Sequence, residues 1–141
     1  MDKRQADLVR ESYHDILLIH SEMFSKIFYD NFFRLYPAAH QIFRETDMKT
    51  QCAMLLAAIT MVIDSLEDSM FESTLRSMGE RHNGYGVSPE GYAAFGEALI
   101  MTVAGFSRLK WTDELHEGWK AFYSEMVSVM TSEDASVTTS S

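Results

Sequence analysis

Apolar positions in this chain recur at steps of three and four residues, which is the period of a helix with one buried face. The first predicted helix covers about residues 2–19, and its inward stripe consists of Leu8, Ser12, Ile16 and Ile19. A second predicted helix covers residues 21–36 and carries four phenylalanines. Long helices are therefore the expected building blocks of the fold.

Prolines and capping residues mark where the first helices end and begin. Pro37 disfavours helical geometry at the residue before it, so it separates the second helix from a short one that ends at Phe43. Thr46 or Asp47 can cap the next helix. One broad face of that helix carries Gln51, Leu55, Ala58, Ile59 and Val62.

The second half of the chain shows the same signals. The capping-box spacing of residues 69–72 predicts a fifth helix, with Phe71, Leu75, Met78 and His82 on one face. The run Asn83-Gly84-Tyr85-Gly86 should end it, because glycine tolerates left-handed backbone angles. Ser88 and Thr112 can cap the last two helices. The pattern predicts an all-α fold of about seven helices in one domain over residues 1–131, and the polar tail 132–141 is expected to fray or be disordered.

Composition and charge argue against several classes of protein. The chain has 141 residues and a formal charge of −9, which argues against nucleic-acid binding and against docking on anionic membranes. Its longest apolar run, residues 52–63, is too short to span a membrane. A lone cysteine, Cys52, fits a reducing compartment, and the charged N-terminal segment is unlike a signal peptide. We expect a cytoplasmic protein, and we assign Cys52 no role.

Among five histidines, His82 is the strongest candidate for chemistry. It lies at the end of an apolar helix face beside Arg81, just before the chain turns. This setting suits an axial ligand of a large planar cofactor that bears carboxylates. Gln51 lies 31 residues earlier, which leaves room for two helices that bring both side chains to opposite faces of one flat ligand.

Simpler interpretations exist for the other candidates. From the residues alone, Tyr29 is more simply a core residue of a phenylalanine-rich helix, and Gln51 an exposed helix residue. Phe43 and Leu55 would belong to the core on any interpretation.

Three segments in order carry a resemblance to bacterial single-domain globins and to the globin domains of flavohemoglobins. The first is Phe28-Tyr29-Asp30-Asn31-Phe32-Phe33, followed by Pro37 and Phe43. The second is the stretch 51–59, which resembles their distal helix, and the third is Arg81-His82-Asn83-Gly84-Tyr85-Gly86-Val87 with Tyr92 and residues 96–99 beyond it. The match spans roughly residues 8–130.

The resemblance implies a heme b cofactor with iron, held in a globin fold. On the distal side, Tyr29 and Gln51 would bind the gas ligand, Leu55 would limit access and Phe43 would wedge against the porphyrin. On the proximal side, His82 would be the iron ligand. The remaining cofactor-binding residues would be Met78, Arg81, Val87, Tyr92 and Phe95.

One feature of flavohemoglobins has no match in this chain. In that family a tyrosine and a glutamate of the last helix hydrogen-bond around the proximal histidine. Tyr92 matches the tyrosine, whereas Glu125 comes too early and Glu133 and Asp134 fall out of register. No flavin or nicotinamide fingerprint is present either.

The implied function is reversible binding of dioxygen, and also of carbon monoxide or nitric oxide, for oxygen binding or delivery. A first alternative is nitric oxide dioxygenase activity with a separate reductase. A second is a globin-fold sensor or interaction module that binds no heme or binds a bilin. The expected state is a monomer or a homodimer with no nucleic-acid or membrane partner.

Overall fold

A computed structural model describes residues 1–66, 71–84 and 88–140, with side chains described over 1–66, 71–79 and 88–131. The elements are all helices in this part of the chain: α1 Lys3–Leu35, α2 Pro37–Ile42, α3 Met48–Asp64, α4 Phe71–Gly84, α5 Pro89–Phe106 and α6 Asp113–Ser140. The predicted all-α fold is confirmed. The α6 backbone is helical to Ser140, and the predicted domain end at residue 131 stays a prediction.

The first two predicted helices form one bent element, α1. His20 has non-helical angles (φ −127°, ψ 26°), and it lies at the boundary that the sequence pattern predicts. The His20 ring packs 5.0 Å from the Phe106 ring, and Phe24 packs 6.0 Å from the same ring. The bend therefore fits α1 around the end of α5. Because the two predicted helices are one element, the described residues form six helices where about seven were predicted.

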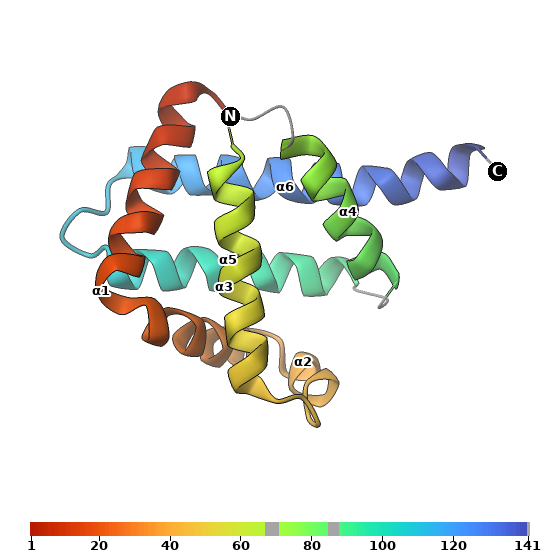
Figure 1. Cartoon of the computed structure of the whole chain (residues 1–141), viewed down its shortest axis with the longest axis horizontal. Coiled ribbons are helices and arrows are strands. Elements are labelled where there is room, and N and C mark those ends of the chain that lie inside the picture. Colours follow the sequence, from red (N-terminus) through yellow and green to blue (C-terminus); the bar gives the residue numbers. More distant parts are fainter. Residues whose placement is uncertain (67–70, 85–87, 141) are drawn as a thin grey trace.

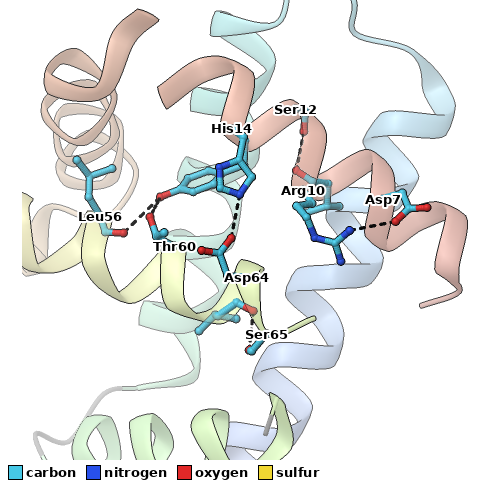
Figure 2. A network of polar contacts seen from close by, with 11 residues as sticks. Asp7, Arg10, Ser12, His14, Leu56, Thr60, Asp64 and Ser65 are labelled. Atoms are coloured by element: carbon cyan, nitrogen blue, oxygen red, sulfur yellow. Dashed lines mark hydrogen bonds and ion pairs between the residues drawn. The ribbon is translucent and has the colours of Figure 1, made fainter. Parts of the chain in front are cut away.

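The predicted stripe of the first helix is right at Ile16 and wrong at Ile19, while Leu8 and Ser12 are half-buried. The buried side chains are Val9, Tyr13 and Ile16, whereas Ile19 is 76% exposed. Tyr13 can be buried because its hydroxyl has polar partners, the Thr60 hydroxyl at 2.8 Å and the Leu56 carbonyl at 3.3 Å (Figure 2).

Local capping explains where the helices start. The Asp47 carboxylate accepts from the Lys49 backbone N–H, so Asp47 rather than Thr46 caps α3. Ser88 caps α5 by accepting from the Gly91 N–H at 3.0 Å, and Thr112 accepts from the Leu115 N–H at 3.1 Å before α6. Residues 69, 70, 85 and 86, which belong to other predicted boundary signals, lie outside the described residues.

The helices pack in crossed pairs, as Figure 1 shows. Helices α5 and α6 lie side by side and antiparallel, and α1 packs against both of them. Helix α4 packs mainly against α6, while α3 packs mainly against α1 and touches α4 only slightly. The largest fully buried side chains come from α1 and α6: Trp119, Tyr13, Phe24, Phe28 and Phe122. In the described part of the chain, no helix has the length and apolar character that crossing a membrane requires.

Candidate functional site

A polar pair of buried Tyr29 and half-buried Gln51 joins α1 to α3. The Gln51 side-chain amide donates a hydrogen bond to the Tyr29 hydroxyl, with 3.0 Å between nitrogen and oxygen. Tyr29 is only 4% exposed, and its ring lies 5.1 Å from Phe28 and 5.7 Å from Phe33. The structure thus brings together the two residues that the resemblance assigns to the distal side.

The start of α3 positions Gln51. Because Asp47 caps this helix, Gln51 falls in its first turn, and its backbone N–H bonds to the Asp47 carbonyl at 3.0 Å. Ser25 fixes the two helices further, since its hydroxyl donates to the Cys52 carbonyl at 3.3 Å. The Cys52 side chain is half-buried, and burial raises the pKa of its thiol.

Phe43 contacts this pair, and Leu55 lies one turn beyond it on α3. The Phe43 ring is 5.8 Å from the Tyr29 ring at 61°, and it is half-buried at the end of α2. Leu55 follows Gln51 by one turn on the same face of α3 and is 7% exposed. The structure therefore joins Tyr29, Gln51 and Phe43 by direct contacts, with Leu55 one turn from Gln51 on the same helix face.

The environment of Tyr29 fixes its protonation state. Burial raises the pKa of its hydroxyl to about 12, although the hydrogen bond from Gln51 acts in the opposite direction. The hydroxyl is therefore neutral at pH 7. Because Gln51 donates to its oxygen, the hydroxyl hydrogen is available to a ligand.

Helices α4 and α5 carry the remaining candidates. Met78 is half-buried on the face of α4 that also holds buried Phe71 and Leu75, as predicted. Tyr92 and Phe95 are half-buried in α5. The Phe95 ring packs 4.7 Å from Phe28, so it reaches the phenylalanines that surround Tyr29.

The proximal candidates are only partly described. His82 and Arg81 belong to the backbone of α4, but their side chains lie outside the described residues, and Val87 lies outside altogether. Their assignment to a cofactor stays a prediction.

Sequence reasoning missed Tyr123 of α6. Its hydroxyl donates to the Tyr92 carbonyl at 2.5 Å, and its ring stacks 6.2 Å from Phe95 at 15°. Burial raises the pKa of this hydroxyl strongly. The ring lies where a side chain on Gly96 would stand, since a Cβ there would be 2.2 Å from it. A glycine inside a helix, Gly96, suggests that another group packs closely there. It does not show which residue that group belongs to.

The fold belongs to a known class. Residues 26–130 match the family model of the globins, and the chain belongs to the globin family, whose members generally bind heme.

Individual relatives agree with this assignment. Among curated proteins, the flavohemoprotein of Bacillus subtilis (strain 168) is 23% identical over 128 residues, which are 87% of this chain and 31% of the relative. That of Bordetella pertussis (strain Tohama I) is 25% identical over 118 residues, which are 82% of this chain and 29% of the relative. The chain thus spans about a third of the length of these relatives.

Solved structures extend the comparison. A protein of Pseudomonas aeruginosa PAO1, described as structurally highly homologous to a human hemoglobin, gives a TM-score of 0.81 at 29% identity, with 92% of this chain and 97% of that chain covered. The hemoglobin of the botfly Gasterophilus intestinalis gives 0.84 at 13% identity, covering 96% and 99%, and shows the fold alone. The resemblance to bacterial single-domain globins and flavohemoglobin globin domains is confirmed.

Proposed function

We propose that this globin binds heme b, which the imidazole of His82 would hold, and that dioxygen and other diatomic gases would bind next to Tyr29 and Gln51. The observation that carries the proposal is the hydrogen bond between these two residues. Two polar side chains from different helices meet among aromatic rings, where each needs a polar partner. This pairing suits the recognition of a small polar ligand.

The described residues fit a large, flat, apolar cofactor. Phe43, Met78, Tyr92 and Phe95 are only half-buried although they pack against the core, so apolar surface is left for another group to cover. Helices α3 and α4 carry Gln51 and His82 respectively, and they touch each other only slightly. Both features favour a cofactor held between these two helices.

Each described residue has a definite task in this scheme. Heme supplies an iron atom at which diatomic gases bind reversibly. The Tyr29 hydroxyl, neutral at pH 7, donates a hydrogen bond to the gas ligand, and Gln51 holds the Tyr29 oxygen in place. Leu55 limits the space above the site and helps to exclude water. Slow release of dioxygen follows, which suits oxygen binding or delivery.

The absorption spectrum of the purified protein tests the proposal. A strong Soret band is expected, with a change when dioxygen is added to the ferrous protein. His82→Ala should weaken or shift the band. His116→Ala is the matched control, because His116 packs against Trp111 at the start of α6. A colourless protein, or a spectrum that His82→Ala leaves unchanged, would rule the proposal out and favour a module that binds no heme.

Similarity to flavohemoproteins favours a second candidate function, nitric oxide dioxygenase activity. In this reaction nitric oxide, dioxygen and one electron give one nitrate ion, so a separate reductase must supply the electron. Nitrate yield discriminates between the two candidates. One nitrate for each protein molecule, with no increase when a reductase and reductant are added, supports the binding role. Formation of many nitrate ions for each protein molecule, when reductase and reductant are present, supports nitric oxide dioxygenase activity.

A further inference from the structure

The outward face of α3 carries no charged residue between its two ends. Residues 50–63 include no Asp, Glu, Lys or Arg. Met54 is 59% exposed and Met61 is 48% exposed, Ala57 is exposed between them, and Ala53 is exposed one residue before Met54. Figure 1 shows α3 crossing the front of the molecule with no other element over it.

The fold itself does not account for this face. Leu55, Ile59 and Val62 occupy the opposite side of α3 and supply its packing against the rest of the molecule. Exposed positions on α4, by contrast, carry Glu72 and Arg76. A solvent-exposed helix face is normally polar, so an apolar one indicates contact with another surface.

Opposite charges stand at the two ends of this face. Lys49 lies at the first turn of α3 and Asp64 at the last. They are 15 residues apart, or about 22 Å along the helix axis. The Asp64 side chain is 54% exposed, although its Oδ1 contacts the His14 ring nitrogen at 2.9 Å (Figure 2).

Helix α1 extends the apolar surface. The contact between His14 and Asp64 sets this part of α1 beside the C-terminal end of α3. Leu18 follows His14 by one turn, on the same face of α1, and is 83% exposed.

We propose that a second copy of this chain docks on this face, so that two α3 helices pack antiparallel about a two-fold axis near Ala57. This symmetry places Lys49 of each copy next to Asp64 of the other. Met54 and Met61 then pack across the axis, where Ala57 allows the two helices to approach closely. A parallel arrangement would instead set like charges side by side.

The contact is small, and the association is correspondingly weak. One helix face and Leu18 provide an area at the low end of specific interfaces, for which dissociation constants of about 10–100 µM are expected. Gln51 and Leu55 lie away from the axis, so dimer formation does not depend on the proposed gas site.

Sedimentation equilibrium between about 10 µM and about 1 mM tests the proposal. The mean mass should rise from 16.1 kDa toward twice that value with increasing concentration. Ala57→Glu sets two carboxylates against each other at the axis and should weaken association about tenfold or more. Ala38→Glu is the matched control, an exposed helical alanine on α2 that should leave association unchanged.

Charge reversal tests the antiparallel register. Lys49→Glu and Asp64→Lys should each weaken association about fivefold or more, because each change affects both ends of the interface. The double variant Lys49→Glu/Asp64→Lys should restore it. A monomer at every concentration, an equal loss in Ala38→Glu, or no rescue in the double variant would overturn the proposal. Circular dichroism confirms that each variant is folded.

Discussion

At the scale of single residues, the hydroxyl of Tyr29 is the most informative group in the molecule. The Tyr29 ring packs against the rings of Phe28, Phe33 and Phe43, and an unpaired hydroxyl on this buried side chain would be costly. Gln51 satisfies its oxygen from another helix. The pair is therefore held in place before any ligand arrives, and a preorganised donor loses little entropy when it binds one.

Removing either member of the pair should speed the release of dioxygen. Tyr29→Phe deletes the donor itself, and Gln51→Leu deletes the group that orients it. Each loss is expected to cost about 1–3 kcal/mol, or about tenfold or more in the dissociation rate constant. Stopped-flow displacement of dioxygen measures this rate.

Gln41→Leu is the matched control for these variants. Gln41 is an exposed glutamine of α2 whose side chain contacts Arg44. Its replacement should leave the dissociation rate unchanged. Wild-type rates in both Tyr29→Phe and Gln51→Leu would contradict the assigned roles.

Tyr13 makes stability depend on pH at the alkaline end. Burial raises the pKa of Tyr13 from 10.0 to about 12 in the folded chain. Between these values the unfolded chain has lost the proton and the folded chain has kept it, so the free energy of unfolding must fall as pH rises. Tyr13→Phe should make this fall shallower, although Tyr29 and Tyr123, whose pKa values burial raises in the same direction, still contribute.

Urea denaturation at a series of pH values from about 9 to about 12 measures this effect. Thr60→Val is the control, because it removes the partner of the Tyr13 hydroxyl and keeps the ionisable group. It should lower stability by about 1 kcal/mol at neutral pH and retain the alkaline fall. A fall as steep in Tyr13→Phe as in the wild type would contradict the prediction.

At the scale of the elements, close helix crossings depend on glycine. Gly79 of α4 lies against the backbone of α6, where an added Cβ would stand 2.6 Å from the Met130 carbonyl oxygen. Because backbone atoms cannot move aside as a flexible side chain can, the two helices would have to separate. This crossing is the main attachment of α4.

Gly79→Ala should therefore lower the free energy of unfolding by about 1–3 kcal/mol, in spite of the better helix propensity of alanine. Gly105→Ala provides the comparison, since nothing lies within 4 Å of its added Cβ. It should leave stability unchanged or raise it by up to about 1 kcal/mol. Chemical denaturation measures both values, and equal effects would show that the crossing is not tight.

The sequence predicts best those features that depend on neighbouring residues. The caps Asp47, Ser88 and Thr112 and the break at His20 are local, and each is found where the pattern predicts it. The burial of Tyr13 in the first helix is not local. It depends on a partner for the Tyr13 hydroxyl that lies 47 residues away, so the pattern alone does not predict it.

The candidate site likewise depends on contacts between residues that are far apart in the sequence. From their own neighbourhoods, Tyr29 resembles a core residue and Gln51 an exposed one, and only the ordered resemblance to globins pairs them. The hydrogen bond joins residues 22 positions apart on two helices. The close contact between the Tyr123 ring and Gly96 cannot be predicted from the neighbours of either residue, because it depends on how α5 and α6 pack.

At the scale of the whole molecule, α1, α5 and α6 form a unit that is tied by buried polar bonds as well as by apolar packing. The Trp119 indole N–H donates to the Ser12 hydroxyl at 2.9 Å, and the Asn31 amide donates to the Thr102 hydroxyl at 3.0 Å. These bonds join α6 and α5 to α1. Helices α3 and α4 lie at the edge of this unit, and they carry the two sides of the proposed cofactor site.

This unequal support predicts how the molecule responds to removal of the cofactor. A ligand that binds only the folded state stabilises it by mass action, and the effect is strongest where the protein's own contacts are fewest. Helix α4 contacts α6 along one side and α3 only slightly. Without heme, the amides of residues 71–84 should therefore exchange with solvent deuterium about tenfold or more faster, while those of residues 94–104 in α5 keep their protection.

Hydrogen–deuterium exchange mass spectrometry of the heme-loaded protein, the heme-free protein and His82→Ala measures the exchange of both segments. Because His82 is the proposed attachment of α4 to the cofactor, His82→Ala with heme added should exchange like the heme-free protein over residues 71–84. Equal protection of that segment in all three samples would mean that α4 does not hold the cofactor.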